Sequence, residues 1–320
     1  MERMRGMRLG ALISAALLCA ITSFSPAGAG SDDATTTAVK RYFLAEANAR
    51  CQLLDGATAM AVTSGYVQAR NALIRSTGGM QSLTPYLGQA RAAAQSVACD
   101  APQLLNEAAA AANAYRAFAT QTRLSLPGAH AEWIGTRAHG TEPGWRLAQY
   151  QSNADADLAL GLYGTLSDNR FTVMADFHDG EKPYAARLIV RDPQVAQNGL
   201  IGRATGSLSD TIPLGFGSGV RTFLASDSQE TEAEIKPRVR ANLIGVSASG
   251  DYVGDQGPVA VKRFDFPSRA WRAIAPLDPR EDIVIAFDFR DGTQYARFEV
   301  GDFITGLGYV RMPSVYGKSL

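Results

Sequence analysis

The residues with the clearest chemical potential lie in one short stretch near the middle of the chain. His130, Glu132 and His139 could act as an acid and a base. Trp133 and Trp145 could stack against a sugar ring or another flat ligand. The spacing fits no metal-binding pattern, because zinc sites place their ligands at characteristic short intervals. We expect a linker whose tryptophans pack into a domain junction, and a site at that junction is the alternative.

Two aspartates, Asp176 and Asp288, occupy matching places in two similar segments. Paired carboxylates carry out acid–base chemistry or glycoside hydrolysis when they share a cleft. Arg187 and Arg297 follow at similar distances along the chain, and carboxylates on the polar face of a strand are common. We therefore expect surface ion pairs here, with catalysis as the alternative. The chain offers no further candidate for a catalytic residue.

A glycine-rich segment, Gly-Phe-Gly-Ser-Gly at 215–219, imitates two motifs and matches neither. The nucleophile motif Gly-x-Ser-x-Gly needs glycine where Phe216 stands. The dinucleotide motif Gly-x-Gly-x-x-Gly needs its third glycine one residue later than Gly219. The segment is interpreted as a loop, and no cofactor or metal is implied.

The first 29 residues have the pattern of a cleavable export signal. Three arginines precede an apolar run from Leu9 to Ile21, and Ala27 and Ala29 place small residues before a cleavage position. The run is too short to span a bilayer, and no later segment approaches about 18 continuous apolar residues. We expect removal of residues 1–29, a periplasmic or secreted protein, and no transmembrane segment after cleavage.

Two cysteines remain after that cleavage, Cys51 and Cys99. A pair of cysteines in an exported protein favours a disulfide, because the compartment is oxidising. A redox role needs close spacing such as Cys-x-x-Cys, which this pair lacks. The sequence therefore predicts a structural Cys51–Cys99 bridge.

Composition and charge are those of an ordinary globular protein. The 320 residues are 46% hydrophobic and 19% charged, and the length is compatible with two domains. Removing residues 1–29 leaves 28 basic and 30 acidic residues, a net charge of −2. This balance argues against a nucleic-acid partner, which needs a basic face.

The first half of the mature chain predicts helices, because it is rich in alanine, leucine and other good helix formers. Thr84-Pro85 and Pro102 predict two helix starts, since proline favours the first helical position. A single helix running up to Ser76 would hold Cys51 too far from Cys99. We expect that helix to break near Gly65, or residues 77–84 to run back along it, giving three or four packed helices.

After about residue 145 the pattern alternates with period two, which predicts strands. The clearest are 170–178 and 282–290, and each precedes Asp-Gly and a second alternating run, as in a hairpin. We interpret the two segments as an internal duplication, with chance similarity as the alternative. A two-residue turn at Asp291-Gly292 would pair Phe287 with Ala296. Further strands are expected at 145–151, 158–163, 219–225, 239–246 and 258–264, and a loop at 226–234.

The expected fold is therefore α+β: a disulfide-stapled antiparallel helical bundle followed by an antiparallel β-sandwich or barrel. The expected division is a signal at 1–29, a helical domain at 30–126, a linker at 127–145 and a β domain at 146–320. The leading functional hypothesis is an exported binding protein without a catalytic centre, which contacts another envelope protein or a small ligand. The alternatives are a hydrolase of envelope carbohydrate or peptide and a structural subunit of an envelope assembly.

Overall fold

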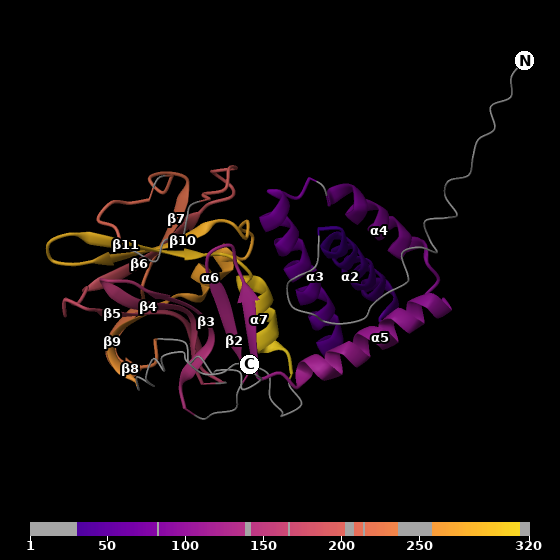
Figure 1. Ribbon diagram of the computed structural model, residues 1–320, viewed down its shortest axis with the longest axis horizontal. Coiled ribbons are helices and arrows are strands. Elements are labelled where there is room, and N and C mark those ends of the chain that lie inside the picture. The colour runs from indigo at the N-terminus through magenta and orange to yellow at the C-terminus, as the bar shows by residue number, and fades with distance from the viewer. Residues whose placement is uncertain are drawn as a thin grey trace, which may run out of the picture. The chain divides into compact units, whose positions relative to one another are not determined.

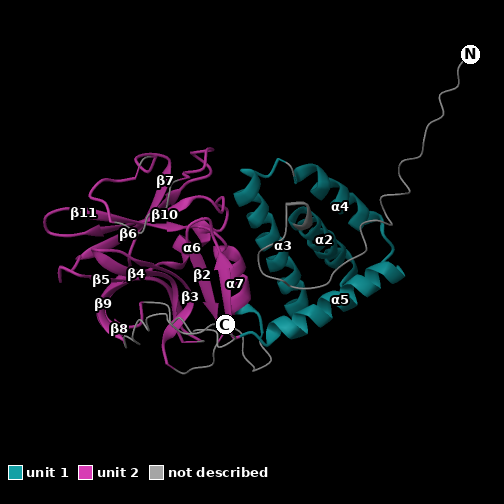
Figure 2. Cartoon of the chain, viewed as in Figure 1, with its two compact units in different colours: residues 1–121, 311–319 teal, residues 122–310, 320 magenta. Residues whose placement is uncertain are grey.

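The computed structural model describes residues 31–81, 83–137, 142–165, 167–201, 208–213, 215–235 and 258–313 (Figure 1). The chain divides into two compact units (Figure 2). The described residues up to Gln121, with 311–313, belong to a helical unit, and those within 122–310 form a β unit. Within these ranges, none of the helices is long and apolar enough to cross a membrane.

The helical unit is built from α2 (Ser31–Cys51), α3 (Gly56–Thr77), α4 (Thr84–Ser96) and α5 (Pro102–Ala119). Prolines occupy the first turns of α4 and α5, as predicted. Helix α3 starts at Asp55, whose carboxylate accepts a hydrogen bond from Thr58 N at 2.8 Å. It ends at Gly78, whose φ of 81° lies in the left-handed region that favours glycine.

The predicted helix break lies in a different place from the one expected. The helix stops directly after Cys51, where Gln52 takes a positive φ of 53°, and α3 begins four residues later. Gly65 instead lies inside α3, where the guanidinium of Arg41 donates to its carbonyl oxygen at 2.7 Å. A β-carbon at position 65 would lie only 3.0 Å from Arg41 Nη1, so glycine permits this close contact.

The disulfide between Cys51 and Cys99 is present, with a Cα–Cα distance of 5.4 Å. It joins the end of α2 to the segment that follows α4. Cys51 borders an apolar cluster contributed by α2, α3, α4 and α5, whose buried members are Leu44, Ala47, Val62, Ala94, Leu104 and Ala111. The early end of α2 therefore solves the length mismatch, because it lets the chain fold back at Cys51 itself.

The β unit contains two antiparallel sheets, as predicted. The first has the order β1-β2-β3-β4-β5-β9-β8 and the second the order β11-β10-β6-β7. The strands of the first sheet are β1 (Arg123–Pro127), β2 (Glu132–Thr136), β3 (Gly144–Ser152), β4 (Ala156–Gly164), β5 (Asn169–Phe177), β9 (Val259–Phe266) and β8 (Asp227–Ala233). Those of the second are β11 (Thr293–Glu299), β10 (Asp282–Asp288), β6 (Ala185–Arg191) and β7 (Val220–Leu224).

Aromatic side chains join the two sheets. Phe287 of β10 lies 5.3 Å from Phe177 of β5 and 6.1 Å from Phe264 of β9, measured between ring centroids. Phe177 and Phe287 belong to the apolar alternation of the sequence, Phe264 ends another expected strand, and all three are buried. Contacts of this geometry stabilise by about 0.5–1.5 kcal/mol beyond the area they bury. The core of the β unit therefore lies between the sheets.

The described part of the segment 127–145, which was expected to be a linker, contains β2 and the start of β3 and so contributes to the first sheet. Helix α7 (Phe303–Arg311) packs on these strands, while α6 (Ser268–Ile274) precedes β10. A β-carbon on Gly135 would lie 2.7 Å from Tyr309, and one on Gly306 would lie 2.5 Å from Leu147. Small residues on both sides thus allow the close approach of helix and sheet.

The hairpin of β10 and β11 forms, but its register differs by two residues from the expected one. Phe287 pairs with Gln294 and Ile285 with Ala296. The turn lies one residue earlier than expected: Phe289 N donates to Gly292 O at 2.8 Å, which leaves Arg290 and Asp291 between them. A shift of two residues leaves every side chain on its expected face, because side chains alternate with period two.

The hairpin expected from the earlier segment does not form. Strand β5 pairs with β4 and β9 in the first sheet, whereas β6 pairs with β10 and β7 in the second. The three residues Glu181-Lys182-Pro183 lengthen the connection, which lets the chain cross between sheets. The sequence likeness of the two segments therefore does not correspond to equivalent strand pairing.

The polar segment 226–234 was expected to be a loop, but most of it is β8, the edge strand of the first sheet. An edge strand with solvent on one side tolerates charged residues, so its apolar pattern is weak. The strand expected at 239–246 and the candidate His139 lie outside the described residues.

Candidate functional site

The candidate residues between 130 and 145 are used mainly for structure. The buried carboxylate of Glu299 accepts hydrogen bonds from the backbone N–H groups of Ala129 (2.6 Å), His130 (2.9 Å) and Ala131 (3.1 Å). His130 therefore contributes its backbone to this loop, while its side chain is exposed. Glu132, also exposed, accepts a hydrogen bond from Ser125 Oγ.

Neither tryptophan proposed for ligand stacking stands free. Trp133 is fully buried, and its indole N–H donates to the carbonyl oxygens of Glu299 and Val300, each at 3.1 Å. Trp145 is half-buried; its N–H donates to Glu234 O at 2.8 Å, and its ring meets Tyr163 edge to face. In this conformation both rings are packing elements.

The two aspartates lie in different sheets. Arg187 binds the carboxylate of Asp288 through two hydrogen bonds of 2.6 and 3.0 Å, so this ion pair joins the arginine of the first segment to the aspartate of the second. Arg297 instead lies 3.9 Å from Asp282. Asp176 is on β5, directly opposite Asp157 of β4. The described residues therefore show no shared cleft for Asp176 and Asp288.

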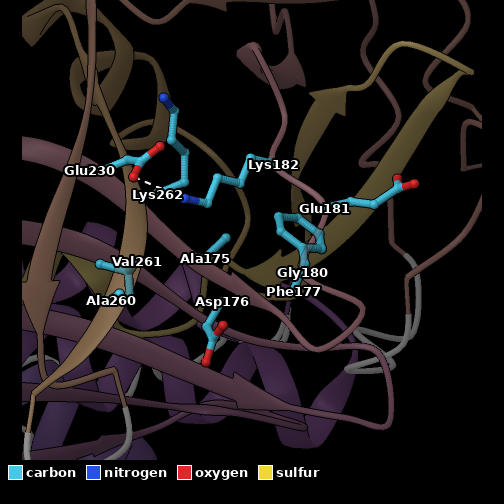
Figure 3. Close-up of a pocket in the computed structure, with 10 residues that line it drawn as sticks. All are labelled: Ala175, Asp176, Phe177, Gly180, Glu181, Lys182, Glu230, Ala260, Val261 and Lys262. Carbon is cyan, nitrogen blue, oxygen red and sulfur yellow. Dashed lines mark hydrogen bonds and ion pairs between the residues drawn. The ribbon is translucent and has the colours of Figure 1, made fainter.

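Asp176 does line a small pocket, shown in Figure 3, between β5, β8, β9 and the connection that follows β5. Lys182 reaches Glu230 across it, with an N–O distance of 2.9 Å, whereas Glu181 points away from the other labelled side chains. The pocket has a volume of about 70 Å³. Pockets for organic ligands usually measure about 300–1,000 Å³, so this one has room only for a few waters or a small ion.

A contact that the sequence reading missed joins Ser152, Asp157 and His178. The hydroxyl of Ser152 donates to buried Asp157, and His178 Nε2 lies 3.3 Å from the same carboxylate. His178 Nδ1 lies 3.0 Å from Ala154 O, so both ring nitrogens are engaged. This geometry differs from a nucleophile–base–acid triad, in which the imidazole bonds the hydroxyl. The Ala154 carbonyl, and next the Asp157 carboxylate, raise the pKa of His178.

A second missed cluster contains buried acids at the open end of the β10–β11 hairpin. Asp282 and Glu299 pair directly across the two strands, and both are buried. Glu281, also buried, receives two hydrogen bonds of 2.7 Å from Arg191. Only the register of the hairpin brings Asp282 and Glu299 together, and their position at strand ends is the one sign of this cluster in the sequence.

The edges of the second sheet are unlike each other. On β11, Tyr295 exchanges two backbone hydrogen bonds with Ser209. Further along the same edge, Gln149 and Gln151 donate side-chain N–H groups to the carbonyl oxygens of Glu299 and Arg297. Strand β7, at the other edge, has no second strand neighbour among the described residues.

The backbone of β7 presents its free groups at alternate residues. Ala225 N donates to Ala186 O and Asp192 N donates to Gly219 O, both at 2.9 Å, so the odd-numbered residues point toward β6. In an antiparallel pair the intervening residues point the other way. The N–H and C=O groups of Val220, Thr222 and Leu224 therefore face outward.

Large exposed apolar side chains accompany this edge. Leu224, at the end of β7, is 61% exposed, and Tyr184, just before β6, is 69% exposed. Val195 is 70% exposed and lies three residues after Asp192. The N–H of Asp192 donates to Gly219 O, next to the other end of β7. Surface apolar groups beside an edge strand mark a surface suited to protein contact.

Comparison of the chain with protein families, curated proteins and solved structures finds no match in any of the three. In the described ranges, no group of three or more histidine, cysteine, aspartate or glutamate residues could hold a metal ion.

Proposed function

We propose that this chain is an exported binding protein of the cell envelope or exterior, which engages another envelope protein through the edge strand β7. The supporting observation is the contrast within one sheet: β11 is covered by side chains and a backbone bridge, whereas β7 offers outward backbone groups beside exposed Leu224. An extended partner segment adds to such an edge by main-chain hydrogen bonding.

The hydrolase hypothesis receives less support. The described candidates His130, Glu132, Asp176 and Asp288 do not converge, and the partners of Glu132 and Asp288 are surface or strand side chains. The pocket beside Asp176 is also too small for a sugar or peptide. Protein binding needs neither a deep pocket nor a catalytic group.

The test uses cross-linked pull-down with the tagged mature chain from its native envelope, comparing Thr222→Pro with Thr222→Val. Proline removes the outward N–H of Thr222 and blocks strand addition, but costs no bond to β6. Valine keeps the N–H and the β-branched shape. We expect one dominant partner, retained by Thr222→Val and reduced about tenfold or more by Thr222→Pro, since a lost tenfold corresponds to about 1.4 kcal/mol.

Tryptophan fluorescence checks that both variants fold, because Trp133, Trp145 and Trp271 all lie in the β unit. Equal capture by a folded Thr222→Pro would exclude β7 as the binding edge. Capture of no partner by any variant would contradict the binding role and direct attention to the residues around 130–145.

A further inference from the structure

The acid pair at the open end of the β10–β11 hairpin is asymmetric. Asp282 and Glu299 face each other across the strands, an arrangement that like charges destabilise. Glu299 is compensated by three backbone N–H donors from residues 129–131.

Asp282 has no such compensation. It is 2% exposed, and its Oδ2 atom has no hydrogen-bond partner. The guanidinium of Arg297 faces it, but its Nη1 lies 3.9 Å from Oδ2, beyond hydrogen-bonding distance. The neighbouring acid Glu281 is held by Arg191 and by the backbone N–H of Asp278 at 2.8 Å, so Arg191 is already engaged.

These surroundings favour the protonated form of Asp282. Burial is the largest cause and raises its pKa to about 6, with Arg297 opposing and with Glu299 and Glu281 adding to the increase. An ionised Asp282 would place a second negative charge beside Glu299 without hydrogen-bond donors to compensate it.

We propose that Asp282 is a proton-uptake site that couples mild acidification to the rigidity of the 128–131 loop through Glu299. When Asp282 is ionised, its charge repels the carboxylate that holds the loop. Protonation removes this repulsion and leaves the three backbone hydrogen bonds to Glu299 stronger. This inference is independent of the proposed binding role, because it concerns the opposite edge of the sheet from β7.

The direction follows from linkage. The pKa of Asp282 is higher in the folded protein than its ordinary value of 3.8, so the folded state binds more protons between the two values. The stabilisation is complete below the unfolded pKa and is lost as pH rises through about 6. The loop is therefore most rigid at mildly acidic pH.

The experiment measures amide hydrogen exchange at Ala129, His130 and Ala131 in the full mature chain, corrected for intrinsic rates. We expect protection to be about threefold or more higher near pH 5 than near pH 7.5. In Asp282→Asn, which is neutral throughout, protection should be independent of pH. Asp291→Asn, an exposed acid in the hairpin turn, is the matched control and should behave like the wild type.

A carboxyl NMR titration of Asp282 in the wild type keeps the test decisive if Asp282→Asn fails to fold. A midpoint near 4 would overturn the proposal. Equal pH dependence of loop protection in the wild type and Asp282→Asn would overturn it as well.

Discussion

The side-chain amide of Gln149 makes both hydrogen bonds that a neighbouring strand would make to Glu299. Glu299 N donates to Gln149 Oε1 at 2.7 Å, and Gln149 Nε2 donates to Glu299 O at 3.0 Å. One residue of β3 in the first sheet thus covers the edge of β11 in the second. Gln151, two residues along the same face of β3, repeats the contact at Arg297 O. Glutamine side chains here complete a sheet edge without adding a strand.

We expect Gln149→Ala to lower the free energy of unfolding of the β unit by about 1–3 kcal/mol, because the buried backbone N–H of Glu299 loses its partner, whereas the carbonyl oxygen keeps the bond from Trp133. Urea unfolding followed by tryptophan fluorescence measures the change, since all three tryptophans lie in this unit. Gln229→Ala, at an exposed position of β8, is the control and should change stability by less than about 0.5 kcal/mol. Equal effects of the two substitutions would contradict the edge-covering role.

The disulfide gives a second prediction. Replacing Cys51 and Cys99 together by alanine should destabilise the helical unit by about 4 kcal/mol, because the bridge closes a loop with a sequence separation of 48. Circular dichroism at the helix band follows the loss during urea unfolding. Reducing agent should bring the wild type to the same midpoint and leave the double variant unchanged. A stable wild type under full reduction would argue against a stabilising bridge.

The contacts of His178 with the Ala154 carbonyl and the Asp157 carboxylate predict a contribution to stability that is lost as pH rises. Most carboxylates lose their contribution as pH falls. The pKa of His178 is raised, so its contribution to stability is present below the ordinary value of 6.5 and is lost as pH rises through the folded value. The difference in unfolding free energy between wild type and His178→Gln should therefore shrink from pH 6 to pH 8. His130→Gln, with an exposed side chain, provides the comparison. A difference that grows with pH would refute the assigned contact.

Local patterns located most of the secondary structure. Proline at the starts of α4 and α5, and alternation along β5 and β10, depend on neighbouring residues only and were read correctly. The break after Cys51 was misplaced because glycine is only a weak helix breaker when tertiary packing needs it. Gly65 lies within α3, where its missing side chain leaves room for Arg41, whose guanidinium donates to its carbonyl oxygen.

Strand pairing was harder to predict than strand position. The register of β10 with β11 depended on where the turn begins, at Arg290 and not at Asp291, and Asp-Gly did not specify it. The separation of β5 from β6 depended on which sheet each strand joins, a choice made by distant partners. The polar sequence of β8 concealed a strand because an edge strand needs little apolar surface.

The sequence by itself determined the α+β order of the chain, the Cys51–Cys99 bridge and the buried faces of the main strands, because composition, periodicity and cysteine count act locally or through simple pairing. Only the tertiary structure decided which acids meet and which edges remain open. Asp282 meets Glu299 through hairpin register, and Gln149 reaches Glu299 across two sheets. Such contacts join residues about 20 to 150 positions apart, and their free energy depends on packing that no short pattern encodes.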